Sequence, residues 1–212
     1  MQIPLEVIGL SKIYNNKDAV KDISFKVNKN EIIGILGPNG CGKTTTIGMI
    51  LGLLKPSNGK VLINGIEIEK KRVDLLNQLN FISPYIELPK KLTVKQNLEV
   101  YGRLYDVKNL KKKIEMLSEK LRLSEIINKL TGELSSGQKN RVSLAKSIIN
   151  NPTVLLLDEP TASLDPETGD FVRSFLESYQ KENKASILLA SHNMSEVERL
   201  CSSVQVLCHC QS

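Results

Sequence analysis

Short apolar runs and longer helical segments alternate along most of this chain. Residues 31–36, 154–157 and 187–190 are apolar runs typical of strands that are buried on both faces of a sheet. Residues 44–54 and 171–181 read as helices. Strands that alternate with helices predict an α/β fold with a mainly parallel sheet, whose ligands bind at the carboxyl ends of the strands.

Two regions depart from this alternation. Residues 5–8 and 23–27 alternate apolar with polar side chains, and an Asn-Gly turn follows residues 60–63, so we expect an N-terminal antiparallel β subdomain with a hairpin. Residues 93–130 are rich in Lys and carry Leu, Tyr and Ile at helical spacing, which predicts an inserted helical subdomain.

The length of 212 residues and the hydrophobic content of 41% suit a single domain with a substantial core. We therefore expect one domain over residues 1–212. We place its core in residues 1–92 and 134–212 and its helical subdomain in residues 93–133.

Hydropathy and charge limit the partners of the chain. No apolar run approaches the roughly 18–20 residues of a membrane span, and the N-terminal residues lack the basic and apolar regions of a signal peptide. We therefore expect a cytosolic protein, and any transport role would need a partner that supplies the membrane part. The net charge of +6 lies largely in Lys-rich helices, which favours a solvated face over a nucleic-acid or lipid patch. The absence of Trp also argues against nucleic-acid binding.

Cysteines are placed unevenly, with Cys41 in a glycine-rich loop and Cys201, Cys208 and Cys210 near the end of the sequence. A disulfide framework is not expected in a cytosolic chain of this size. Cys208-His209-Cys210 could suggest a metal, but its spacing matches no standard zinc pattern. We therefore expect neither structural disulfides nor a metal site at these residues.

Residues 37–44 fit the phosphate-binding pattern G-x-x-x-x-G-K-[ST], between a predicted strand and a predicted helix. Glycines let successive backbone N–H groups turn toward an anion, and the helix N-terminus adds partial positive charge. Lys43 can reach the β- and γ-phosphates of a nucleoside triphosphate, and the Thr44 hydroxyl can bind Mg²⁺. The candidate nucleotide-binding residues here are Gly37, Pro38, Asn39, Gly40, Cys41, Gly42, Lys43, Thr44 and Thr45.

Two later segments carry further candidate chemistry. Asp158 and Glu159 follow an apolar strand, where Asp158 can hold Mg²⁺ through water and Glu159 can orient or deprotonate an attacking water; adjacent acids can also form a surface turn. Residues 134–138 (Leu-Ser-Ser-Gly-Gln) precede a helix that we expect to begin near Lys139. Their Ser hydroxyl and Gly amides offer a second anion site or an ordinary helix cap.

In this order, the motifs resemble those of the nucleotide-binding subunit of ATP-binding cassette (ABC) transporters, over about residues 5–200. Residues 37–44 resemble the first Walker motif of that family, and Leu-Leu-Leu-Asp-Glu-Pro at 155–160 resembles the second. Residues 134–138 resemble the LSGGQ signature, and Ser-Leu-Asp at 163–165 resembles the D-loop. The resemblance implies a P-loop NTPase core with a mainly parallel sheet, an N-terminal antiparallel β subdomain and an inserted helical subdomain.

The resemblance also implies an ATP hydrolase that uses Mg²⁺, bound by Thr44 and Asp158, and pairs head to tail with a second copy or a related cassette. Each ATP would lie between one phosphate loop and the partner's signature, so its γ-phosphate would meet Lys43 on one side and the signature residues Ser135, Gly137 and Gln138 on the other. Glu159 and His192 would be catalytic, and Tyr14 would stack on adenine. From the residues alone, a lone His is more often a core or surface residue, and a Tyr near a strand often only packs.

The chain departs from the family pattern at Pro84, which occupies the position of a family Gln in the loop before the helical subdomain. Proline has no side-chain amide to contact Mg²⁺ or the attacking water, and it has no backbone N–H. Either a neighbour such as Glu87 substitutes for the Gln or the coupling is altered. We therefore expect that ATP binding is kept, whereas hydrolysis is slow or depends strongly on the partner.

The segment after the switch histidine is a second departure. Members of the family usually continue there with another strand, a basic turn and a further helix. Residues 201–210 resemble none of these elements. We interpret the segment as a truncated or frame-shifted end that lacks the terminal elements.

Residues 92–105 and 191–198 resemble exporters that pair with ABC-2-type membrane subunits. We therefore expect an integral membrane permease as partner and a position on the cytoplasmic face of the cell membrane. Two alternatives stay open. One is a soluble cassette ATPase of translation or DNA repair, although those usually carry two cassettes or long insertions. The other is a module that binds ATP with little turnover, which Pro84 would favour.

Overall fold

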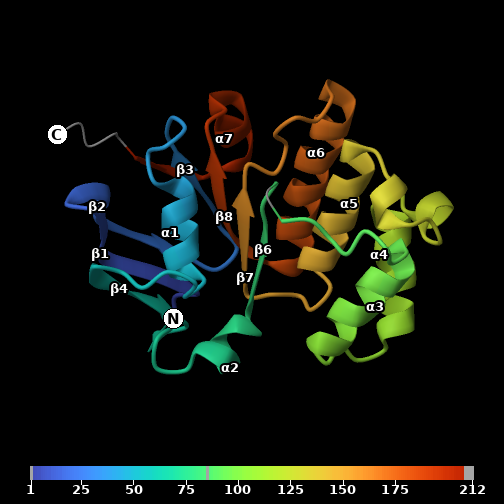
Figure 1. Ribbon diagram of the computed structural model, residues 1–212, viewed down its shortest axis with the longest axis horizontal. Coiled ribbons are helices and arrows are strands. Elements are labelled where there is room, and N and C mark those ends of the chain that lie inside the picture. Colours follow the sequence, from blue (N-terminus) through green and yellow to red (C-terminus); the bar gives the residue numbers. More distant parts are fainter. Residues whose placement is uncertain (1, 85, 208–212) are drawn as a thin grey trace.

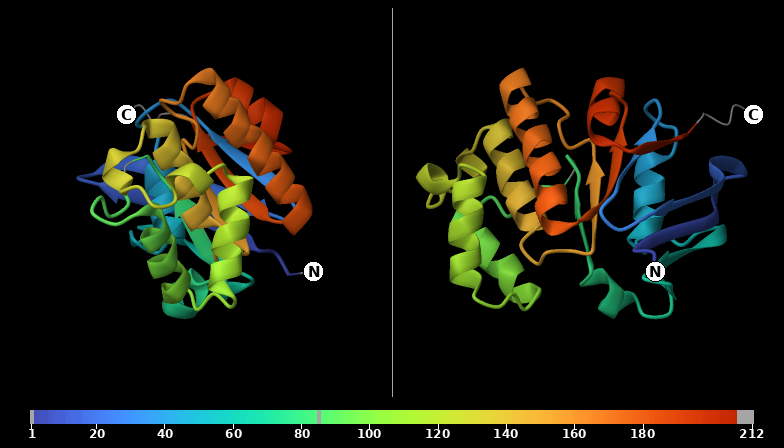
Figure 2. Two further views of the ribbon diagram at one scale, coloured as in Figure 1. Left: turned by 90° about the vertical axis from the view of Figure 1, so that its right-hand side faces the viewer. Right: turned by 180° about the vertical axis from the view of Figure 1, so that it is seen from behind.

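The computed structural model describes residues 2–84 and 86–207, which form two sheets with helices between and beside them (Figure 1). The antiparallel sheet has four strands in the order β2-β1-β4-β5, and the parallel sheet has five in the order β6-β7-β8-β3-β9. Helix α1 lies on the side of the antiparallel sheet, α5 and α6 lie on the opposite side of the parallel sheet, and α3 and α4 lie beyond α5 (Figures 1 and 2). The expected α/β fold is confirmed.

The strands are β1 (Leu5–Tyr14), β2 (Lys17–Val27), β3 (Ile32–Leu36), β4 (Asn58–Ile63), β5 (Ile66–Glu67), β6 (Leu79–Ile82), β7 (Val154–Asp158), β8 (Ser186–Ser191) and β9 (Ser203–Val206). The α-helices are α1 (Lys43–Ile50), α2 (Arg72–Leu76), α3 (Val94–Leu104), α4 (Leu110–Lys120), α5 (Ser136–Ser147), α6 (Pro166–Asn183) and α7 (Met194–Leu200). Two 3₁₀ turns, Ser124–Ile126 and Thr131–Glu133, join α4 to α5.

The parallel sheet brings the ends of distant segments to one edge. Strands β6, β7, β8, β3 and β9 all pair in parallel, with Leu157 opposite Ile82 and Asp158 opposite Ala190. Because parallel strands share their carboxyl edge, the residues that follow β6, β7, β8 and β3 meet there. This edge is where the sequence places its candidate chemistry.

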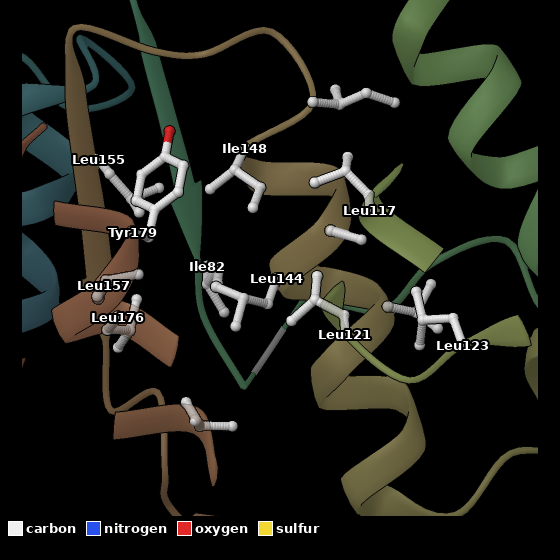
Figure 3. Packing of buried hydrophobic residues seen from close by; sticks show 14 of the residues in the cluster. Ile82, Leu117, Leu121, Leu123, Leu144, Ile148, Leu155, Leu157, Leu176 and Tyr179 are labelled. Atoms are coloured by element: carbon white, nitrogen blue, oxygen red, sulfur yellow. The ribbon is translucent and has the colours of Figure 1, made fainter. Parts of the chain in front are cut away.

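Apolar residues line both faces of the parallel sheet, which explains why its strands read as continuous apolar runs. In β7, Leu155 and Leu157 pack against the helices α5 and α6, where Leu144 and Leu176 lie (Figure 3). Leu156 packs on the opposite side, in the cluster that includes α1 and the antiparallel sheet. When both faces of a strand are covered, its side chains are apolar on both faces, so apolar and polar residues do not alternate along it.

Several predicted element boundaries differ from the structure. Helix α1 ends at Ile50 rather than at residue 54, because Gly52 takes a left-handed φ of 63° and its N–H donates to the carbonyl of Met49. The region 93–130 divides into α3, α4 and a 3₁₀ turn, and α5 begins at Ser136 rather than near Lys139. Helix α2 and strand β6 were not predicted from the sequence.

The interpretation of residues 201–210 as a segment without the next family strand is wrong for its first part. Ser203–Val206 form β9, which pairs in parallel with β3 at the edge of the sheet. The segment looked irregular because polar residues occupy half of it, as an edge strand tolerates. The possible metal ligands Cys208-His209-Cys210 lie outside the described residues, whereas Cys41 and Cys201 are free thiols.

Within residues 2–84 and 86–207, no helix combines the length and the apolar character that crossing a bilayer requires.

A buried lysine joins the core to the helical subdomain. The ammonium of Lys146 on α5 donates to the Asn80 side chain (3.4 Å) and the Phe81 carbonyl (3.2 Å), and it lies 5.4 Å from the ring centroid of Tyr101 on α3. Among the described residues no carboxylate pairs with it. Burial therefore lowers the pKa of Lys146 from 10.5 to about 8.

This pKa predicts how the stability changes with pH. Between pH 8 and 10.5 the unfolded chain binds more protons at Lys146 than the folded chain, so the free energy of unfolding rises with pH in this window. We expect Lys146→Met to lose this rise, on the order of 1–3 kcal/mol, in denaturant titrations at pH 7 and pH 10. The exposed Lys112→Met variant is the control, and an equal rise in both variants would contradict the assignment.

Candidate functional site

The loop between β3 and α1 has the geometry of an anion site. Gly40 and Gly42 take left-handed φ angles of 84° and 98°, and a Cβ on Gly42 would lie 2.4 Å from the carbonyl oxygen of Ala19. Helix α1 starts at Lys43, and its N-cap Gly42 provides no side-chain hydrogen bond. The first N–H groups of α1 therefore have no side-chain cap and can bind an anion.

Lys43 lies beneath this loop and is 6% exposed. Its ammonium donates to the carbonyls of Gly37 (2.6 Å) and Pro38 (3.1 Å), and it lies 3.5 Å from Oε1 of Glu159. The loop thus holds the positive charge of Lys43 close to the Glu159 carboxylate, which follows β7.

Asp158 ends β7 and is buried. Its Oδ2 accepts a hydrogen bond from the Thr44 hydroxyl at 3.1 Å, which joins β7 to the start of α1. Burial raises the pKa of Asp158, while the bond from Thr44 acts in the opposite direction. A cation bound beside this carboxylate would offset the cost of burying its charge.

Glu159 and His192 form an acid–imidazole pair at the same edge. The Oε2 atom of Glu159 lies 2.8 Å from Nδ1 of His192. Glu159 takes a left-handed φ of 50°, and within the described part of the chain its buried Oε1 has no hydrogen-bond donor. The pair can therefore accept and pass on a proton at the mouth of the site.

A cavity of about 290 Å³ lies between these groups. It is lined by Ala19, Asn39, Gly40, Gly42, Lys43, Thr44, Thr45, Asp158 and Glu159. Nearly all of its lining was predicted from the sequence. Gly37 and Pro38 face the site through their carbonyls, whereas Cys41 is buried in the core below the loop.

The signature residues do not line this cavity. Ser135 is the N-cap of α5, where its hydroxyl accepts a hydrogen bond from the Gln138 N–H and its own N–H donates to the Gln138 side chain. This capping box uses both side chains locally and leaves Gly137 in the first turn. Within the described chain these residues therefore do not face the cavity formed by the phosphate loop.

Tyr14 also lies outside the cavity lining. It ends β1, is 45% exposed, and carries the Lys12 ammonium 5.0 Å from its ring centroid. The ring is about half exposed, and the Lys12 ammonium lies over one of its faces.

Comparison with known proteins decides the family. A family model described as ABC transporter matches residues 20–162. The chain belongs to the ABC transporter family. The ATP-binding protein NatA of Bacillus subtilis is 36% identical over 88% of this chain and 76% of its own length, and the Nod factor export ATP-binding protein I of Rhizobium johnstonii is 39% identical over 97% of this chain and 66% of its own length. A solved structure titled as the ATP binding subunit of an ABC transporter superposes with a TM-score of 0.88 at 29% identity, covering 96% of this chain and 85% of the other.

This ATP-binding subunit contains a buried carboxylate that the sequence analysis missed. Glu196 on α7 is 2% exposed and accepts hydrogen bonds from the hydroxyls of Thr161 (2.6 Å) and Ser191 (2.7 Å). Ser191 directly precedes His192, and Thr161 lies shortly after Glu159. Glu196 therefore ties together the two loops that carry the acid–imidazole pair. The sequence signal that could have indicated this role was the position of Glu196, four residues after His192 and on the buried face of a helix.

Pro84 of this subunit follows Ser83 just beyond the end of β6, on the side of the site next to Asp158. It lines a second cavity, of about 280 Å³, which Glu159 also lines. Glu87, the suggested substitute for the missing Gln, has a side chain that is 61% exposed and lies 2.6 Å from the Lys90 ammonium. Glu87 also lines the same cavity as Pro84 and Glu159, so it remains a candidate substitute for the family Gln.

Proposed function

We propose that this ATP-binding subunit hydrolyses ATP with Mg²⁺ at sites shared by two chains that pair head to tail, and that a separate integral membrane permease uses the energy for export. The observation that carries the proposal is the convergence of Lys43, Thr44 and Asp158 with the Glu159–His192 pair in and beside one cavity. Such a site has a phosphate cradle, oxygens for a hard cation and a base for water.

In the proposed mechanism, the N–H groups of residues 39–45 and the Lys43 ammonium bind the β- and γ-phosphates. Mg²⁺ at Thr44 and Asp158 would neutralise phosphate charge. Glu159 orients and deprotonates the attacking water. His192 hydrogen-bonds the γ-phosphate and, through Nδ1, holds the Glu159 carboxylate in place. Tyr14 stacks on the adenine.

We pair two chains in this proposal because the signature does not line the cavity of its own chain. In the proposed dimer, Ser135, Gly137 and Gln138 of one chain close on the γ-phosphate held by the other. The exposed start of α5 supports this arrangement: the capping box occupies the N–H of Gln138, while the N–H groups of Ser136 and Gly137 in the first turn receive no side-chain cap and can meet an anion. Hydrolysis would remove the phosphate that joins the chains.

The names of similar proteins support a permease partner and export. One relative is named for Nod factor export, and the similar solved structure is described as a subunit of a transporter. We propose that the chain works on the cytoplasmic face of the cell membrane as one domain, with its core in residues 1–92 and 134–212 and residues 93–133 as the helical subdomain. The alternative of an ATP-binding module with little turnover is favoured by Pro84 alone.

A phosphate-release assay tests the function and the effect of Pro84 together. We expect slow ATP hydrolysis by the purified chain, and an increase of about 3- to 10-fold in Pro84→Gln with the permease present, because one hydrogen bond to the attacking water is worth about 0.5–1.5 kcal/mol. The absence of both ATP binding and phosphate release would contradict the proposed function. An unchanged rate in Pro84→Gln would contradict only the role given to Pro84.

A further inference from the structure

Ser83 lies beside the proposed metal site although no motif includes it. It follows β6 directly, and because Ile82 pairs with Leu157, it stands next to Asp158 at the carboxyl edge of the sheet. Its hydroxyl donates to Oδ2 of Asp158 at 3.5 Å. The Thr44 hydroxyl donates to the same oxygen at 3.1 Å.

The spacing of these oxygens matches a magnesium shell. Mg²⁺ binds six oxygens octahedrally at about 2.0–2.1 Å, so neighbouring ligand oxygens lie about 3 Å apart. The distances of 3.1 Å and 3.5 Å from the Asp158 oxygen to the two hydroxyls are close to this value. The Asp158 oxygen is thus separated from each of the two hydroxyls, which come from two other segments, by about the spacing of adjacent ligands.

Pro84 contributes to this geometry. A residue before proline is restricted to extended backbone conformations, because the proline ring clashes with its N–H and Cβ. Pro84 therefore limits the backbone freedom of Ser83 as the chain leaves β6. The same residue that removes a side-chain amide from this loop also fixes a hydroxyl beside Asp158.

We propose that the Ser83 hydroxyl is a ligand of the Mg²⁺ that accompanies ATP, and that it supplies the oxygen which Pro84 cannot. The inference rests on the proposed function, since it concerns the metal of the same ATP site. The side-chain amide of the family Gln, which Pro84 lacks, would contact both the metal and the attacking water. Ser83 takes over contact with the metal, whereas contact with the attacking water is not replaced.

The test is a Mg²⁺ titration of nucleotide binding, which does not depend on turnover. A fluorescent ATP analogue is bound to the chain in chelator, and MgCl₂ is then added until the signal saturates. In Ser83→Ala we expect the half-saturating Mg²⁺ concentration to rise about 10-fold, as losses around metal sites typically do, while binding in chelator is unchanged. Ser83→Thr keeps a hydroxyl and should behave as wild type.

Controls separate the metal effect from folding and from the function itself. Ser143→Ala removes a half-buried hydroxyl that lines the same cavity as Ser83, and it should leave the Mg²⁺ dependence unchanged. Adding Pro84→Gln to Ser83→Ala should restore the wild-type Mg²⁺ dependence, which a misfolded protein could not do. Equal half-saturation in Ser83→Ala and wild type would overturn the inference. Failure of the wild type to bind the analogue under any condition would overturn the proposed function.

Discussion

Glu159→Gln is expected to reduce ATP turnover by about 100-fold or more and to leave ATP binding intact. Glutamine has nearly the same shape as glutamate, so it can keep the contact with Nδ1 of His192, but it cannot accept the proton of the attacking water. It also removes the negative charge that lies 3.5 Å from the Lys43 ammonium, which should favour phosphate binding. Phosphate release and equilibrium binding of a fluorescent ATP analogue measure the two effects separately.

Glu198→Gln is the matched control for this variant. Glu198 is an exposed glutamate on α7, so its replacement changes the net charge by the same amount without touching the cavity lining. It should retain wild-type turnover. Wild-type turnover in Glu159→Gln would remove Glu159 from the proposed chemistry and would direct attention to His192 as the group that activates water.

Lys43→Met should weaken ATP binding by about 100-fold or more. Methionine fills a similar volume without the charge, so the loop keeps its packing but loses charge-assisted hydrogen bonds to phosphate, which are worth about 1.5–3 kcal/mol each. The variant also leaves Oε1 of Glu159 buried without the neighbouring cation. Because the chain contains no Trp, the fluorescence of a labelled nucleotide can be measured without interference from indole.

Lys112→Met tests whether the loss comes from the phosphate site. Lys112 is exposed on α4, in the helical subdomain, and its replacement removes one positive charge from the protein as a whole. It should bind ATP as the wild type does. A similar loss in both variants would mean that general electrostatic attraction, rather than Lys43, accounts for the affinity. Thermal unfolding of both proteins shows whether either change has altered the fold.

The sequence predicted those parts of the site that depend on local patterns. The phosphate loop and the two acids at the end of β7 were found because glycine spacing and an apolar strand that ends in Asp158 are visible in short segments. Ser83 and Glu196 were missed because their roles depend on register. Ser83 is beside Asp158 only because β6 pairs with β7, and Glu196 contacts Thr161 only because α7 folds back over the sheet.

The fold was predicted less well at its edges than at its centre. Central strands are apolar throughout and so stand out, but β9 mixes polar and apolar residues, and its strand character comes from hydrogen bonds to β3. In sequence, the short elements α2 and β6 lie between the antiparallel β subdomain and the helical subdomain. Each is too short to show a clear hydrophobic period. Their conformation is set by tertiary contacts, such as the pairing of β6 with β7, rather than by local propensity.

The strand order has a consequence for how the protein is made. Strand β3 precedes the phosphate loop early in the chain, yet both of its neighbours, β8 and β9, come from residues 186–206. During synthesis β3 must wait for almost the whole described chain before it can be paired on both sides, and such long-range pairing is slow to form and exposed to aggregation until it is complete. The nucleotide loop is therefore synthesised early, but the sheet on both sides of the strand that leads into it is completed only near the end of synthesis.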